Sequence, residues 1–205
     1  LDQLTPTPTP LPTATPPSVM PPELVGQILF WSNREGGNRL YSLDPESGRI
    51  ARLADHWPYD LAMRSEARAP YGNYRLVVRE DERRIPQVFV YDEQFQVDRN
   101  LSQSTSWAYD AVWSPLGDRI AYVSQEPGND EIYVTDPEGA NKMRLTHNGW
   151  EWDKHPTWSP DGSQIVFYSN RDVGRRQLWI MEADGSNQRR LIESDQEDWD
   201  PVWVK

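Results

Sequence analysis

The amino-acid sequence predicts an all-β fold, a small four-bladed β-propeller, and three observations carry this prediction. A β-rich segment that ends in an acid occurs four times, and the acids are Asp44, Asp92, Asp136 and Glu182, which lie 44 to 48 residues apart. Turns rich in proline and glycine separate the strands. The last segment, residues 201–205, is a strand that the first repeat lacks. A period near 45 residues with four strands is typical of a propeller blade.

Each repeat divides into four strands, which we name A to D from the inner to the outer edge of the blade. The B strands begin at Ile28, Leu76, Ile120 and Ile165. The C strands are the segments that end in the four acids, and a leucine nine residues further on marks each D strand: Leu53, Leu101, Leu145 and Leu191. The A strands are expected at Met63, Trp113, Trp158 and Trp203. Six extra residues follow Met63 in the second repeat, and we interpret residues 66–72 as a longer loop.

The order of these strands predicts how the ring closes. The folded part starts on a B strand and ends just after an unpaired A strand at residues 201–205. We therefore expect the C-terminal strand to complete the first blade and close the ring by β-pairing. Closure would also leave no bare sheet edge. An exposed edge can pair with other chains and cause aggregation.

The N-terminal segment has a different composition from the repeats. Residues 1–22 hold eight of the 18 prolines and a single charge, Asp2. Such a stretch favours extended polyproline II structure and cannot bury an apolar core. We divide the chain into a Pro/Thr-rich extended linker at residues 1–24 and a four-bladed β-propeller at residues 25–205. The linker resembles spacers that hold bacterial extracytoplasmic domains away from a membrane or wall, so an anchor is expected upstream; a tail without a specific role is the alternative.

The fourth repeat carries a family resemblance. Residues 156–171, with Trp158-Ser-Pro-Asp-Gly162 at their centre, and residues 177–185 resemble the TolB-type, WD-like β-propeller repeat. The third repeat matches well and the first two more weakly. The resemblance implies an extracytoplasmic binding scaffold of the kind found on bacterial envelope proteins and beside hydrolase or sensor domains.

Composition and motifs exclude several classes of function. The net charge of −11 argues against a nucleic-acid partner, because phosphate binding needs a basic surface. No apolar run approaches the ~18 residues of a membrane span, so we expect no direct membrane insertion. The chain has no cysteine, and it matches no hydrolase, metalloprotease or nucleotide-binding motif. We therefore expect no enzyme activity and no cofactor, apart from the cation considered below.

Ten tryptophans are a large number for 205 residues, and they fall into two groups. Five repeat with the strands and are expected to pack between blades: Trp31, Trp113, Trp158, Trp179 and Trp203. The other five tryptophans fall in D-to-A loops, which share one face of a propeller, and two tyrosines and one histidine join them there: His56, Trp57, Tyr59, Trp107, Tyr109, Trp150, Trp152 and Trp199. Large aromatic side chains suit a recognition surface, since they offer rigid apolar area with a polar tip. Capping of the blade ends is the alternative.

A second set of residues repeats just before each A strand. These are Asp60, Asp110, His155 and Asp200, spaced 45 to 50 residues apart. Fourfold repetition predicts that they surround the mouth of the central channel, where the carboxylates would repel one another. Either a bound cation or hydrogen bonds to neighbouring blades would compensate.

These observations lead to one functional expectation and two alternatives. We expect a non-catalytic, extracytoplasmic binding or scaffold module, tethered by its linker, that recognises a protein, peptide or glycan on the D-to-A face. The first alternative is a structural envelope component or the sensor domain of a larger anchored protein. The second is a hydrolase that acts through Asp60, Asp110 or Asp200.

Overall fold

The computed structural model describes residues 19–205, which form an all-β fold with one α-helix and one short 3₁₀ turn. The strands make four antiparallel sheets within this range. The strand order of the first sheet is β15-β1-β2-β3, which are Asp198–Trp203, Ile28–Ser32, Arg39–Leu43 and Ile50–Arg52. The predicted pairing of the last strand with the first repeat is observed, since Trp203 of β15 lies opposite Ile28 of β1.

The second sheet departs from the predicted pattern. It has three strands, β4 (Tyr74–Glu80), β5 (Pro86–Asp92) and β6 (Val97–Asn100), and the helix α1 (Trp57–Glu66) stands where an A strand was expected. The strand predicted at Met63 is therefore wrong. The chain starts a helix here because a proline stands in the first turn, where its missing N–H costs nothing, and helix-forming residues follow it. The predicted loop at residues 66–72 begins with the last residue of this helix.

The third and fourth sheets follow the predicted repeat. The third contains β7 (Ala108–Trp113), β8 (Ile120–Ser124), β9 (Glu131–Thr135) and β10 (Met143–Arg144). The fourth contains β11 (Asp153–Trp158), β12 (Gln164–Ser169), β13 (Gln177–Glu182) and β14 (Arg189–Arg190). In both sheets the A, B, C and D strands lie side by side in chain order, as in a propeller blade.

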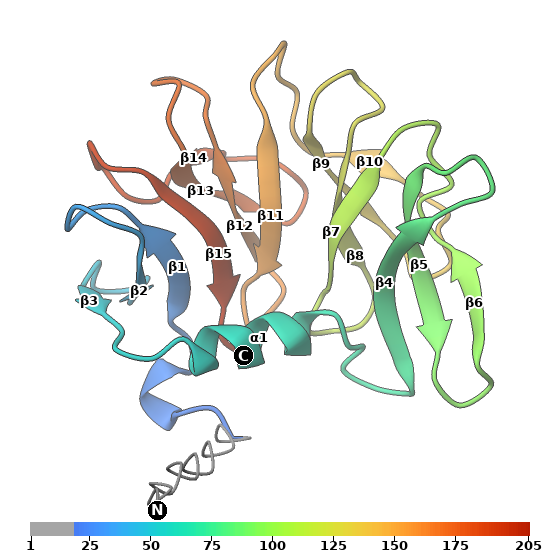
Figure 1. The fold of residues 1–205 in the computed structure, drawn as a ribbon, viewed down its shortest axis with the longest axis horizontal. Coiled ribbons are helices and arrows are strands. Elements are labelled where there is room, and N and C mark those ends of the chain that lie inside the picture. Colours follow the sequence, from blue (N-terminus) through green and yellow to red (C-terminus); the bar gives the residue numbers. More distant parts are fainter. Residues whose placement is uncertain (1–18) are drawn as a thin grey trace, which may run out of the picture.

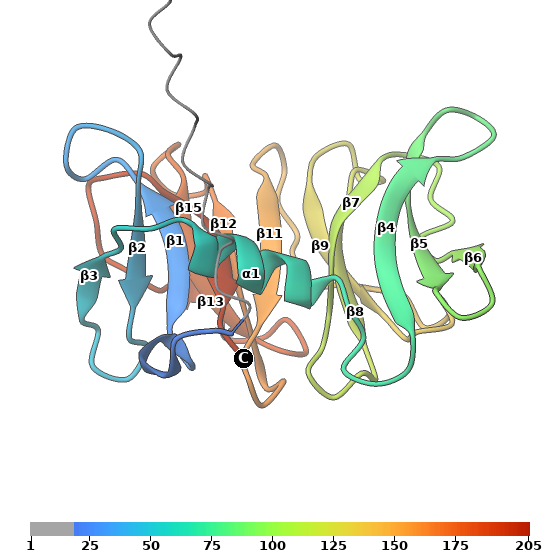
Figure 2. The same cartoon turned by 60° about the horizontal axis from the view of Figure 1, so that its bottom comes forward.

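The sheets stand in an arc, in the order first, fourth, third, second (Figure 1). The strand β15 packs against the fourth sheet, β11 packs against the third, and β7 packs against the second. The helix α1 runs along the side of the arc between the first and second sheets (Figures 1 and 2). The predicted closed ring of four blades is therefore not confirmed, because a helix lies where those two sheets would meet.

Aromatic side chains fill the interfaces between sheets. The three tryptophans that repeat on A strands, Trp113, Trp158 and Trp203, are each at most 6% exposed. Trp179 is also buried, and Trp31 is half-buried against two apolar clusters. The expectation that these five residues pack between sheets agrees with their positions.

The helix and the N-terminal segment share a small core of their own. Tyr59 and Ala62 of α1 pack with Leu29 of β1 and Val202 of β15. The 3₁₀ turn η1 (Pro22–Leu24) adds a buried leucine to this cluster. Residues 1–18 of the predicted linker lie outside the described residues, whereas its last residues pack against the first sheet.

Candidate functional site

Three inner strands carry the same irregularity at the same position. The pairing register of β7 with β8 shifts between Tyr109 and Val112. The registers of β11 with β12 and of β15 with β1 shift at the corresponding positions. The residue within each bulge has a positive φ: 50° for Asp110, 49° for His155 and 48° for Asp200. Aspartate and histidine tolerate this left-handed conformation better than most residues. The bulges therefore re-aim three side chains that a regular strand would direct elsewhere.

These bulges bring Asp110, His155 and Asp200 together, and we name these three residues the axial cluster. The Nε2 atom of His155 lies 3.3 Å from Oδ2 of Asp110 and 3.6 Å from Oδ1 of Asp200. The imidazole thus links carboxylates from the strands on either side of its own. Asp60, the fourth residue predicted here, lies exposed in the first turn of α1 and has no counterpart bulge.

Burial and like charge shape the electrostatics of the axial cluster. Burial raises the pKa of Asp110, the nearby Asp200 adds to this rise, and His155 opposes it. The Tyr59 hydroxyl donates a hydrogen bond of 3.0 Å to the backbone oxygen of Asp200. Burial raises the pKa of Tyr59 as well, so this phenol stays a neutral donor. The ring of Tyr168 stacks on His155 at 5.9 Å.

A cavity of about 230 Å³ opens beside the axial cluster, and Asp110, His155 and Glu66 are among its lining residues. Glu66, at the end of α1, is 4% exposed. The Thr157 hydroxyl and the Lys205 ammonium both donate to its Oε1, the latter at 2.7 Å. The sequence did not reveal Glu66, because the repeat pattern assigned it to a loop.

The axial cluster consists of one imidazole within 4 Å of two carboxylates. The His155 ring therefore lies between two carboxylates that would otherwise face each other, and compensation by hydrogen bonds from neighbouring blades stays a prediction. Within residues 19–205 no group of three or more His, Asp or Glu side chains has an arrangement suited to a metal ion. Cation binding at Asp60, Asp110, His155 and Asp200 stays a prediction.

Two tryptophans of the predicted recognition face are open to solvent. Trp107 precedes β7 and is 54% exposed, and Trp150 precedes β11 and is 70% exposed. Trp107 lies on the loop that leads from the second sheet into the third, and Trp150 lies on the loop that leads from the third sheet into the fourth. Both side chains are therefore available for contact with a partner.

A mixed aromatic and basic group connects this face to the axial cluster. The Lys154 ammonium lies 5.8 Å from the ring centre of Tyr109 and 5.5 Å from that of Trp152. It also pairs with Asp130 at 3.1 Å. Trp152 packs edge-on against Tyr168, which in turn stacks on His155. Lys154 was not identified from the sequence, where only its aromatic neighbours repeat.

Of the other residues predicted for this face, Trp199 and Tyr59 are buried, Trp57 is half-buried and His56 is exposed. Trp199 lies within β15, 7% exposed, under the Arg176 guanidinium at 3.9 Å. Tyr59 is buried in α1, and Trp57, in the same helix, is half-buried. His56 is exposed just before α1, with its ring 5.0 Å from that of Trp31. The structure thus places four residues in a helix or strand and not in the loops expected for them: Trp57, Tyr59, Tyr109 and Trp199.

Successive antiparallel sheets of three or four strands stand side by side in an arc (Figure 1). This repetition is typical of a propeller-type repeat protein. A family model described as the TolB beta propeller domain matches residues 74–205, which is more than half of the chain. The chain belongs to this family. The helices among the described residues are too short and too polar to cross a membrane.

Two sequence relatives share only part of their length with this chain. An uncharacterized protein of Agrobacterium fabrum, Atu1656, is 37% identical over 89 residues, which are 43% of this chain and 30% of that protein. The uncharacterized peptidase YuxL of Bacillus subtilis is 29% identical over 100 residues, 46% of this chain and 15% of that protein. The chain spans less than a third of either relative.

Two solved structures have a similar fold. TolB from Acinetobacter baumannii superposes with a TM-score of 0.57 at 23% identity, over 89% of this chain and 44% of that one. A putative TolB from Agrobacterium tumefaciens gives 0.55 at 20% identity, over 80% of this chain and 61% of that one. At these identities the likeness concerns the fold.

Proposed function

We propose that this protein is a non-catalytic binding module whose recognition surface is the D-to-A face of the third and fourth sheets. The observation that carries the proposal is the exposure of Trp107 and Trp150 on adjacent loops. Between them and the axial cluster lie Tyr109, Lys154 and Trp152, so apolar rings and a cation are available together. Such aromatic anchors dominate the binding energy of many interfaces.

The ligand class follows from these side chains. Exposed indole rings offer flat apolar area to a peptide or a glycan, and Lys154 offers hydrogen-bond donors to its polar groups. The TolB family membership supports a binding or scaffold role. In this proposal the module works outside the cytoplasm, held at a distance from its anchor by residues 1–24.

The proposal includes a finer description of the propeller. The four sheets act as four blades, with β15 fastening the first blade to the end of the chain. The helix α1 takes the place of the missing inner strand and spans the interval between the first and second blades. The loops of the D-to-A face are then held on one rigid support.

A peptide and glycan array tests the surface assignment. We expect Trp107→Ala/Trp150→Ala to weaken binding of any array ligand by about tenfold or more, because each lost anchor costs roughly 1–2 kcal/mol. Phe95→Ala is the matched control, since Phe95 is 69% exposed on the turn between β5 and β6, at the opposite face. Unchanged binding in the double variant, or an equal loss with Phe95→Ala, would refute the assignment and favour a structural role.

A further inference from the structure

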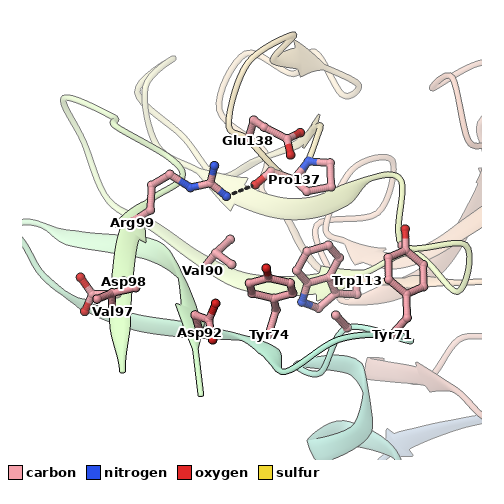
Figure 3. Close-up of a pocket in the computed structure, with 12 residues that line it drawn as sticks. Tyr71, Tyr74, Val90, Asp92, Val97, Asp98, Arg99, Trp113, Pro137 and Glu138 are labelled. Carbon is pink, nitrogen blue, oxygen red and sulfur yellow. Dashed lines mark hydrogen bonds between the residues drawn. The ribbon is translucent and has the colours of Figure 1, made fainter. Parts of the chain in front are cut away.

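A second cavity lies on the face opposite the recognition surface. It has a volume of about 450 Å³ and sits between the second and third sheets, among the A-to-B and C-to-D turns. Its walls include Tyr71 and Tyr74, which are 61% and 42% exposed, and the buried Trp113. Figure 3 shows the two tyrosines on either side of Trp113. This volume falls within the range of ordinary small-ligand sites.

The next interface along the arc shows what fills the equivalent space. Between the third and fourth sheets, the Arg119 guanidinium lies 4.7 Å from the ring centre of Trp158. It donates hydrogen bonds to two backbone carbonyls, to Gly162 at 3.2 Å and to Ala183 at 3.4 Å. An arginine of the chain itself thus stacks on the repeated tryptophan and binds the adjoining turns.

The same surroundings recur around the cavity, but the arginine does not. Trp113 corresponds to Trp158, and the turn residues Gly117 and Pro137 correspond to Gly162 and Ala183; all three counterparts line the cavity. Strand register places Tyr74 at the position that Arg119 holds in the third sheet. With tyrosine in place of arginine, Trp113 lacks the stacked guanidinium that Trp158 has, although Arg99 from the neighbouring strand β6 reaches the Pro137 carbonyl.

The charges around the cavity favour a cation. Three carboxylates line it, those of Asp92, Asp98 and Glu138, against one guanidinium, that of Arg99. Arg99 donates a 2.5 Å hydrogen bond to the Pro137 oxygen, as Figure 3 shows, and the neighbouring Arg79 pairs with Asp98. Asp92 and Glu138 make no ion pair within the described residues.

We propose that this cavity binds the guanidinium group of an arginine side chain presented by a peptide or protein partner. The group would stack on the aromatic walls as Arg119 stacks on Trp158. Its planar donors suit carbonyl and carboxylate acceptors, and it gives up its hydration more readily than a lysine ammonium. The site is separate from the D-to-A face, so it gives the module a second point of contact.

Titration of the ¹⁵N-labelled chain with acetyl-Gly-Arg-Gly-amide tests the site directly. The indole N–H signal of Trp113, identified by its loss in Trp113→Phe, should shift and saturate. Replacing the arginine of the peptide by citrulline, which is neutral and nearly the same shape, should weaken binding by about tenfold. A lysine peptide should bind more weakly than the arginine peptide, because it cannot stack as a plane.

Two variants separate the site from general effects of charge. Glu138→Gln should weaken arginine-peptide binding by about threefold, as expected for a partly exposed ion pair. Glu46→Gln is the matched control, because Glu46 holds the same place in the Asp-Pro-Glu turn of the first sheet and should leave binding unchanged. Tyr74→Arg should supply the internal guanidinium and abolish binding while the melting temperature is retained.

Each alternative outcome overturns the proposal. The absence of a saturable Trp113 shift would show that the cavity takes no arginine. Equal binding of the citrulline or lysine peptide would show that the guanidinium is not what the site selects. An equal loss with Glu46→Gln, or full binding with a folded Tyr74→Arg, would show that the peptide binds elsewhere on the acidic surface.

Discussion

Asp110, His155 and Asp200 adopt a conformation that most residues avoid, and they do so at one repeated position. A left-handed backbone costs a residue with a side chain roughly 1–2 kcal/mol. The sequence spacing predicted that these residues would lie close together, and it could do so because it records the repeat. It could not predict the bulges, since the hydrogen-bond register of a strand depends on its partner. The cluster is thus a product of both the residue types and the paired strands.

Asp110 supports a prediction about pH. Because burial raises its pKa, the folded chain binds this proton more tightly than the unfolded chain does. The protein is therefore expected to become less stable as the pH rises from about 4, the ordinary pKa of aspartate, through the raised pKa of Asp110 in the folded chain. Asp110→Asn removes this loss. We expect the variant to gain stability relative to the native chain between pH 4 and pH 7, as measured by urea unfolding.

The exposed Asp60 provides the control for this measurement. Asp60→Asn changes the same chemical group at an exposed position in the first turn of α1. Its stability relative to the native chain should vary less with pH than that of Asp110→Asn. A stability difference for Asp110→Asn that shrinks toward pH 7 would contradict the stated role of burial.

The helix α1 shows where prediction from a repeat fails. The spacing of the tryptophans on the other A strands led to a strand prediction at Met63, which is a helical residue. Local signals pointed the other way: a proline in the first turn, an acid near the helix start, and a run of helix formers. Periodicity identified three complete sheets and the shared strand β15, whereas local propensity decided the one irregular element.

The attachment of α1 supports a prediction about stability. Glu66 at its end is buried and pairs with Lys205, whose side chain is 23% exposed. Lys205→Met leaves this carboxylate buried without its cation, and we expect a loss of about 2 kcal/mol in the free energy of unfolding. Adding Glu66→Gln removes the uncompensated charge and should restore most of that loss. Urea unfolding of both single variants and the double variant gives the coupling.

The double variant also provides the contradicting outcome. If Lys205→Met and Glu66→Gln destabilise the chain additively, the two groups do not interact and α1 is held by its apolar face alone. Recovery in the double variant would show that the ion pair fastens the helix to the end of the chain.

At the scale of the whole molecule, the sheets are joined by contacts that run from the first to the fourth and back toward the second. The sequence predicted a closed ring in which the last strand pairs with the first repeat; the pairing is observed, and the closure is not confirmed. It could not predict that the sheets form an arc, because this depends on the helix α1, which lies between the first and second sheets (Figures 1 and 2). The cavity over Trp113 was equally hidden, since it arises from the comparison of two interfaces in space.

The strand β15 joins the first sheet to the fourth, and we expect the fold to depend on it. It pairs with β1 and packs against the fourth sheet, and it buries Trp199, Val202 and Trp203. Loss of one such core tryptophan costs about 3–5 kcal/mol, and a whole domain is stable by only about 5–15 kcal/mol. We therefore expect a chain truncated after residue 197 to lose its cooperative melting transition and the dispersion of its amide NMR signals.

Complementation distinguishes loss of this strand from a general failure to fold. A synthetic peptide of residues 198–205 should restore the amide dispersion of the truncated chain, because the free edge of β1 offers unpaired backbone groups to an added strand. A peptide of the same composition in scrambled order keeps the charge and hydropathy but loses the match of Trp203 with Ile28, and it should fail. Unchanged melting of the truncated chain would refute the role of β15, because the first and fourth sheets would then be held by other contacts.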